Sequence, residues 1–292
     1  MNWKVGDLVV ERVVESERPV LAPSVLFPDA TPAPIAAHRP WLEPHLLDPQ
    51  SGLLILAFHS FVLRTPNHTI LVDTCGGNHK PRPKRPRYHM QSWPYLENLA
   101  AAGLAPEAVD FVLCTHLHVD HVGWNTRLRD GRWVPTFPNA RYLFGRVEWA
   151  HWEQQLKSPD YAEDPHLADS VIPIIEAGLA VFVESDHAIE DGVWLEPTPG
   201  HTPGHVAVHV ASRGRRAVLP GDLMHHPLQC VEPDWSTYIC TDPAQARATR
   251  RAFLDRHAES DTLIFPAHFP TPTAGRIVRA GATWGFAFHA GD

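Results

Sequence analysis

The sequence predicts a layered α/β sandwich, because strand-like segments alternate with helical ones along most of the chain. Short apolar runs recur between residues 53 and 265, and amphipathic patterns lie between several of them. The chain has 292 residues, 44% of them hydrophobic, which is enough to bury a sizeable core. No repeat or long linker divides it. We therefore expect one domain over residues 1–292, with a proline-rich arm at about residues 22–50.

The expected strands are apolar runs that end at turn-forming residues. They cover residues 53–58, 69–73, 109–114, 140–144, 193–195, 205–210, 216–219 and 262–265, the last of which is the final predicted strand. The first two are separated by a short turn beginning at Pro66, so we expect them to form a hairpin.

Three segments have helical patterns: residues 92–102, which stop before Gly103, then residues 148–156 and residues 243–257. The third has the clearest start, because Pro243 suits the first turn and either Thr241 or Asp242 suits the N-cap.

Two long segments fit neither pattern. Residues 22–50 are rich in proline and apolar side chains, and could form the arm of a homodimer. Residues 78–90 are basic and proline-rich, and a segment this long can be a lid or a partner contact. For residues 78–90 we expect an ordinary solvated loop.

Charge and composition restrict the partners. A net charge of -8 argues against nucleic acid, which needs an excess of Lys and Arg. No apolar run is long enough to span a bilayer. The four cysteines lack C-x-x-C spacing, so a cysteine zinc site is not expected. We expect a cytoplasmic protein that acts on a small-molecule substrate.

The strongest chemical signal is the segment THLHVDHVG at residues 115–123, directly after a predicted strand. It gathers His116, His118, Asp120 and His121 within six positions. So many imidazoles beside a carboxylate would crowd and repel unless a cation bound them, and neutral imidazole and carboxylate are good ligands for zinc-like ions.

Three further residues follow predicted strands in the same way: His201, Asp222 and His268. Each alone would be a weak signal, since a lone histidine is more often structural. Together with the first motif they put metal-binding side chains at the ends of four strands, where open α/β sheets place their ligands.

These seven residues and the order of the strands resemble the metallo-β-lactamase superfamily, over nearly the whole chain. The resemblance implies an αββα four-layer sandwich with two divalent metal ions. It assigns His116, His118 and His201 to one metal. It assigns Asp120, His121 and His268 to the other, and makes Asp222 the bridge. Zinc suits these ligands best, and iron, cobalt and manganese are compatible.

The implied chemistry is hydrolysis by a hydroxide held between the metals, because two cations lower the pKa of the shared water. Asp120 is then both a ligand and a candidate proton shuttle to the leaving group. The carboxylate Asp222 stands where true metallo-β-lactamases usually have Cys or Ser. This difference favours the branch of lactonases, aryl-ester hydrolases and methyl parathion hydrolase.

Many lactonases of that branch have a catalytic tyrosine three residues after the bridging aspartate, where this chain has His225. An imidazole can donate the same hydrogen bond, so His225 is a candidate catalytic residue, with a surface histidine as the alternative. The predicted substrates are acyl-homoserine lactones or aryl esters. Organophosphate triester hydrolysis, a di-iron redox protein and a non-catalytic metal-binding module are the alternatives.

Supporting roles are also expected. His205 should hydrogen-bond the loop that carries His201, and the resemblance implies that Asp73 supports the loop that carries His116. The predicted substrate-binding residues are Trp124, Phe137 and Trp235, for which packing in the core is the alternative.

Overall fold

The computed structural model describes residues 1–158, 161 and 165–291. The chain divides into two compact units. The first unit comprises Met1–Ser16 and Phe58–Ala188, and the second comprises Glu17–Ala57 and Ile189–Asp292. The boundary between Ser16 and Glu17 falls inside strand β2, and the boundary between Ala57 and Phe58 falls inside strand β3. The expectation of a single domain stays a prediction.

The first sheet has the order β1-β2-β3-β4-β5-β8-β9 among the described residues. Its strands are β1 (Asn2–Val5), β2 (Leu8–Leu21), β3 (Leu54–Arg64), β4 (Thr69–Val72), β5 (Phe111–Leu113), β8 (Arg141–Gly145) and β9 (Ala180–Val183). β3 and β4 pair antiparallel, which confirms the predicted hairpin. β4, β5, β8 and β9 are parallel neighbours.

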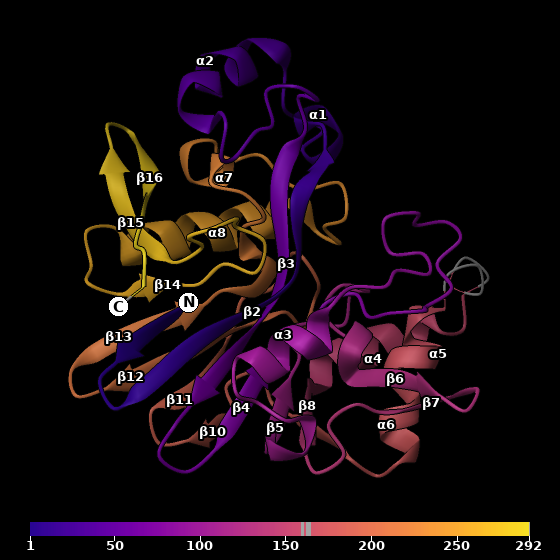
Figure 1. Ribbon diagram of the computed structural model, residues 1–292. Coiled ribbons are helices and arrows are strands. Elements are labelled where there is room, and N and C mark those ends of the chain that lie inside the picture. The colour runs from indigo at the N-terminus through magenta and orange to yellow at the C-terminus, as the bar shows by residue number, and fades with distance from the viewer. Residues whose placement is uncertain (159–160, 162–164, 292) are drawn as a thin grey trace. The chain divides into compact units, whose positions relative to one another are not determined.

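Helices of the first unit bury the apolar residues of this sheet. They are α3 (Tyr95–Ala101), η1 (Pro106–Ala108), η2 (Gly123–Asn125), α4 (Arg146–Gln155), α5 (His166–Ser170) and α6 (Ile172–Glu176). A small separate hairpin joins β6 (Thr126–Arg129) to β7 (Arg132–Pro135). Leu99 of α3 belongs to the same buried cluster as Leu71 of β4, and α4 contacts β8 and β9 (Figure 1).

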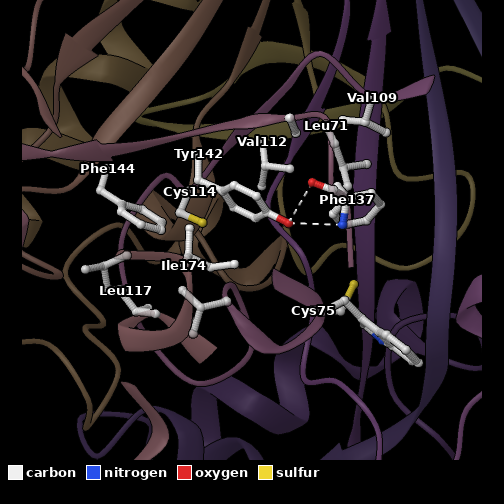
Figure 2. Close-up of a cluster of buried hydrophobic side chains, with 14 of the residues drawn as sticks. Leu71, Cys75, Val109, Val112, Cys114, Leu117, Phe137, Tyr142, Phe144 and Ile174 are labelled. Carbon is white, nitrogen blue, oxygen red and sulfur yellow. Dashed lines mark hydrogen bonds between the residues drawn. The ribbon is translucent and has the colours of Figure 1, made fainter. Parts of the chain in front are cut away.

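The core of the first unit lies between these helices and the parallel strands. Figure 2 displays part of it, including Leu71, Val112 and Ile174. Tyr142 places its phenol inside this core, where its oxygen lies 3.1 Å from the Phe137 backbone nitrogen, a donor. A buried hydroxyl needs such partners, because an unpaired one costs free energy.

The second sheet has the order β10 to β16 among the described residues. Its strands are β10 (Ala188–Glu190), β11 (Val193–Pro197), β12 (Val206–Ser212), β13 (Arg215–Leu219), β14 (Leu263–Ile264), β15 (Gly275–Ala280) and β16 (Thr283–Phe288). The prediction that the strand near residues 262–265 is the last was wrong, because β15 and β16 follow it and pair antiparallel. Two arginines interrupt β15, and a glycine interrupts the aromatic residues of β16, so neither strand forms the continuous run of aliphatic residues that marked the other strands.

Helices of the second unit are α1 (Pro23–Leu26), α2 (Pro32–Leu42), η4 (Gly221–Leu223), α7 (Leu228–Val231) and α8 (Pro243–His257). The helix expected over residues 243–257 is confirmed. Asp242 is its N-cap, and its side chain accepts a hydrogen bond from Gln245 N at 2.9 Å. Phe253 and Leu254 of α8 pack against Ile264 of the sheet. The proline-rich segment 22–50 contains α1 and α2.

The basic segment 78–90 differs from the solvated loop that we expected. Lys80 and Arg82 are 0% and 1% exposed, because both bind Asp169, the carboxylate of α5. Charged side chains are almost never fully buried unless they are paired, and sequence composition could not reveal a partner 87 residues away.

Candidate metal-binding residues

Asp73 fixes the start of the histidine-rich loop 115–123. It follows β4, and its carboxylate accepts hydrogen bonds from the Thr115 backbone N–H at 2.8 Å and the Thr115 hydroxyl at 2.9 Å. The other contact of that carboxylate is His121 Nδ1, at 2.9 Å. Because Asp73 holds Nδ1 of His121, Nε2 is the nitrogen that remains for a metal. The supporting role predicted for Asp73 is confirmed.

His116 and His118 lie side by side in the same loop. His116 Nε2 is 3.0 Å from His118 Nδ1, while the other nitrogen of His116 is 3.1 Å from the Thr115 hydroxyl. Two imidazole nitrogens on one tetrahedral zinc are about 3.3 Å apart. This pair is therefore spaced much as two ligands of one metal would be.

Asp120 and His121 form the other close pair of the loop, with ligand atoms within 4.8 Å of each other. Oδ1 of Asp120 is 4.0 Å from His121 Nε2. Oδ2 of Asp120 accepts a hydrogen bond of 2.7 Å from the hydroxyl of Tyr88. No local pattern in the sequence predicted this contact, because Tyr88 lies in the basic segment 78–90.

A set of buried side chains that sequence reasoning missed holds the peptide between His116 and His118. The backbone N–H of Leu117 donates to Glu148 at 3.0 Å, and its carbonyl lies 2.9 Å from His166 Nε2. Trp152 of α4 also donates to Glu148, at 2.7 Å. An apolar amphipathic pattern was the only sign of α4, and it does not reveal which polar residue faces inward.

The second unit brings three imidazoles to one carboxylate. His201 Nε2 is 3.1 Å from Asp222 Oδ2, and His225 Nε2 is 3.0 Å from the same oxygen. The other oxygen, Oδ1, is 3.0 Å from His268 Nε2. All four side chains are at most 4% exposed. The strand ends of β11, β13 and β14 thus converge on Asp222.

His205 hydrogen-bonds the backbone of Asp222, the carboxylate residue of this cluster. Its Nε2 accepts a hydrogen bond from the Asp222 backbone N–H at 2.9 Å, and its Nδ1 is 2.8 Å from the Thr198 hydroxyl. The structural role predicted for His205 is therefore observed, with Asp222 as the residue that it positions directly. His268 is oriented in the same manner, because its Nδ1 is 2.9 Å from the carbonyl oxygen of Ala57.

The electrostatics of the cluster suit a cation. Burial lowers the pKa of His225 to about 4, so this imidazole is neutral at pH 7, the form that binds metals. Burial acts in the same direction on His201, but the neighbouring Asp222 carboxylate outweighs it and raises the pKa to about 9. A metal ion that binds His201 would displace that proton.

His225 shows a further sign of a missing partner. Within the part of the chain that the structure describes, neither of its buried ring nitrogens makes an aligned hydrogen bond. Its proximity to Asp222 is a close contact without that alignment. A buried polar group left without a partner costs about 1–3 kcal/mol, so a side chain kept in this state points to a ligand.

The predicted substrate-binding residues lie in packed surroundings. Phe137 is 0% exposed and belongs to the core of the first unit. Trp124 is 4% exposed, stacks on Tyr95 at 5.2 Å and donates to Glu15 at 2.7 Å. Trp235 in the second unit is 7% exposed and lies 5.9 Å from the ring of Phe27. Core packing accounts for these positions, and the substrate-binding role stays a prediction.

Comparisons with known proteins identify what this chain is similar to. The family model of the metallo-beta-lactamase superfamily matches residues 58–268. No curated protein matches the chain.

Several solved structures share the fold over nearly their whole length. A hydrolase called AbOPH, of the beta lactamase superfamily, is 24% identical, with a TM-score of 0.82 over 100% of this chain and 98% of its own. AidC, a dizinc quorum-quenching lactonase, is 19% identical, with a TM-score of 0.81 over 99% and 97%. A probable metal-dependent hydrolase from Staphylococcus aureus is 20% identical, with a TM-score of 0.74 over 94% and 93%.

Proposed function

This chain belongs to the metallo-β-lactamase superfamily, and we propose that within it the protein is a dinuclear hydrolase that opens a lactone or cleaves an ester. The observation that carries the proposal is the carboxylate of Asp222, whose two oxygens face different imidazoles. Oδ2 lies beside His201 and Oδ1 lies beside His268. This division of its oxygens suits a carboxylate that bridges two cations.

The family match confirms the predicted fold and the predicted class, a metal-dependent hydrolase. None of the described helices has the length and hydrophobicity that crossing a bilayer requires. A cytoplasmic location and a homodimer stay predictions.

We propose that the ligands form two sets, one for each metal. His116, His118 and His201 are proposed for the first metal. Asp120, His121 and His268 are proposed for the second, with Asp222 as the bridge. The spacing of His116 and His118 supports the first set, and the orientation of His121 by Asp73 supports the second. Neutral imidazoles with carboxylates fit zinc, and iron, cobalt and manganese are also compatible.

Two bound cations would supply an ionised water near neutral pH and would polarise the substrate's carbonyl oxygen. The protein's own residues then handle protons and orientation. In this proposal Asp120 accepts a proton and passes it to the leaving oxygen. His225 is neutral at pH 7 and buried beside Asp222, so it suits donation of a hydrogen bond to the carbonyl or the leaving oxygen.

The decisive test combines metal analysis with a substrate panel. The purified protein should contain two equivalents of divalent metal and hydrolyse acyl-homoserine lactones or aryl esters, and a chelator should abolish the activity. The panel should also contain a phosphotriester, because organophosphate hydrolysis is the alternative within the same chemistry.

Two variants sharpen this test. Asp120→Asn should lower kcat by about 100-fold or more, because it removes a ligand and the proton acceptor together. His45→Ala, at an exposed histidine, is the matched control and should behave as wild type. Turnover of every substrate by metal-free protein, or reversible iron redox chemistry without hydrolysis, would contradict the proposal.

A further inference from the structure

The loop of residues 78–91, called here the tyrosine loop, is closed at its base by paired hydrogen bonds. Asn78 and Trp93 exchange two of them, at 2.7 and 2.8 Å. Further along, the Met90 N–H donates to the Lys80 carbonyl at 2.8 Å. A loop closed in this manner has a defined shape rather than a wide range of conformations.

A buried ion cluster fixes the tyrosine loop to the body of the first unit. Arg82 donates two hydrogen bonds to Asp169, at 2.6 and 2.7 Å, in the bidentate geometry that is strongest for this pair. Lys80 donates to the Thr126 hydroxyl at 2.8 Å. Because these charges are buried, moving the loop would expose or unpair them at considerable cost.

Tyr88 is held at the far end of this loop. Its backbone N–H donates to the Arg85 carbonyl at 2.9 Å, and its ring meets Phe58 edge-on with centroids 5.8 Å apart. Its hydroxyl donates to Asp120 Oδ2 at 2.7 Å. The backbone and the ring are thus fixed independently of the hydroxyl.

The contact with Tyr88 distinguishes the two oxygens of Asp120. Oδ2 is the oxygen that Tyr88 holds, and Oδ1 is 4.0 Å from the metal-binding nitrogen of His121. A hydrogen bond to one carboxylate oxygen restricts rotation of the group. The other oxygen is thereby kept in a fixed direction.

We propose that Tyr88 is a positioning residue, whose hydroxyl fixes the Asp120 carboxylate so that one oxygen binds metal and the other handles the proton. This rests on the proposed function, in which Asp120 is both ligand and proton acceptor. Tyr88, which lies outside the histidine-rich loop, would thereby orient Asp120, the residue proposed to bind metal and accept the proton.

The test compares Tyr88→Phe with the matched control Tyr238→Phe, which removes a hydroxyl from an exposed tyrosine. Tyr88→Phe keeps the ring contact with Phe58 and should fold with a Tm near that of wild type. A charge-assisted hydrogen bond of this kind corresponds to roughly a 10- to 100-fold effect. We expect a loss of that size in kcat, with KM changed much less, and a steeper dependence of rate on the leaving group's pKa.

Metal binding gives a readout that does not require turnover. Competition with a chromogenic zinc chelator should reveal one metal equivalent held more weakly in Tyr88→Phe, while the other is unchanged. On an Asp120→Asn background the same change should have little further effect, because the two residues act through one contact.

The outcomes separate this inference from the proposed function. If wild type with two metals hydrolyses nothing on the panel, the proposed function fails, and chelator competition still tests Tyr88. If Tyr88→Phe matches Tyr238→Phe in both metal competition and leaving-group dependence, the positioning role is wrong. A lowered Tm with unchanged metal affinity would also overturn it, since that pattern belongs to a purely structural tyrosine.

Discussion

The carboxylate of Glu148 accepts a hydrogen bond of 3.0 Å from the backbone N–H of Leu117, the residue between His116 and His118. The same oxygen, Oε1, accepts from Trp152 at 2.7 Å. A side chain of α4 thus determines the direction of the peptide that carries two predicted ligands. Positions behind a metal site commonly matter in this manner.

Replacing Glu148 should separate loss of the acceptor from loss of the charge. Glu148→Ala leaves two buried N–H groups unpaired, at about 1–3 kcal/mol each, so its free energy of unfolding should fall by about 2–6 kcal/mol. Glu148→Gln keeps one oxygen in place and should lose less. Urea unfolding of the metal-free proteins checks the order, and equal losses in both variants would contradict it.

Asp73 offers a test of orientation without removal of a ligand. In Asp73→Asn the amide can no longer accept from both Thr115 and His121, so the ring of His121 loses its fixed tautomer. Replacing such a partner typically costs 10- to 100-fold in metal affinity or activity. Asp110→Asn is the matched control, because Asp110 accepts a hydrogen bond from the Thr69 N–H in the same sheet. Chelator competition measures both variants, and equal affinities would refute the role.

Lys80 should make stability depend on pH. Burial lowers its pKa to about 7, although Asp169 acts in the opposite direction. An unfolded lysine has a pKa of about 10.4, so between about pH 7 and 10 the unfolded chain binds more protons than the folded one. Stability contributed by this group therefore rises with pH across that window.

Lys80→Met removes this dependence while it keeps most of the side-chain volume. From pH 7 to 10, the free energy of unfolding of wild type should rise relative to Lys80→Met by an amount on the order of a few kcal/mol. Lys157→Met, at an exposed lysine, should follow wild type. Denaturant titrations at several pH values give the comparison, and parallel curves for Lys80→Met and wild type would show that Lys80 does not titrate there.

Gly123 closes the histidine-rich loop against the backbone of Gly76. A Cβ at position 123 would lie 2.0 Å from the Gly76 carbonyl carbon, and backbone cannot yield as a flexible side chain can. Gly123→Ala should therefore cost more than about 3 kcal/mol or prevent folding. Gly131→Ala meets no atom within 4 Å and introduces only the strain of φ +75°, about 1 kcal/mol. Equal Tm values for the two variants would contradict this account.

Local patterns in the sequence predicted the regular elements well where one signal was sufficient. The cap at Asp242 and Pro243 placed α8 at its observed bounds. Apolar runs located β4 and β5. The same search missed β2 over Leu8–Leu21, because its pairs of valines are separated by Glu, Arg and Ser and no continuous apolar run forms.

The histidine-rich loop could be predicted for the same reason, because its residues directly follow a strand. The supporting role of Asp73 was implied by the family resemblance. Tyr88 was not, because its contact with Asp120 depends on how a loop folds. The buried pairing of Arg82 with Asp169 fixes that loop, and it joins segments that have no local relation in sequence. Long-range ion pairs leave no periodic trace.

Leu117 is fully buried in the core of the first unit (Figure 2). It is the residue between His116 and His118, two of the predicted ligands. Any shift of those ligands would pull this leucine out of its packing. Natural variants of such an enzyme should therefore change their substrate preference through substitutions in other loops. Substitutions within residues 115–123 should be rare, because they would disturb this packing.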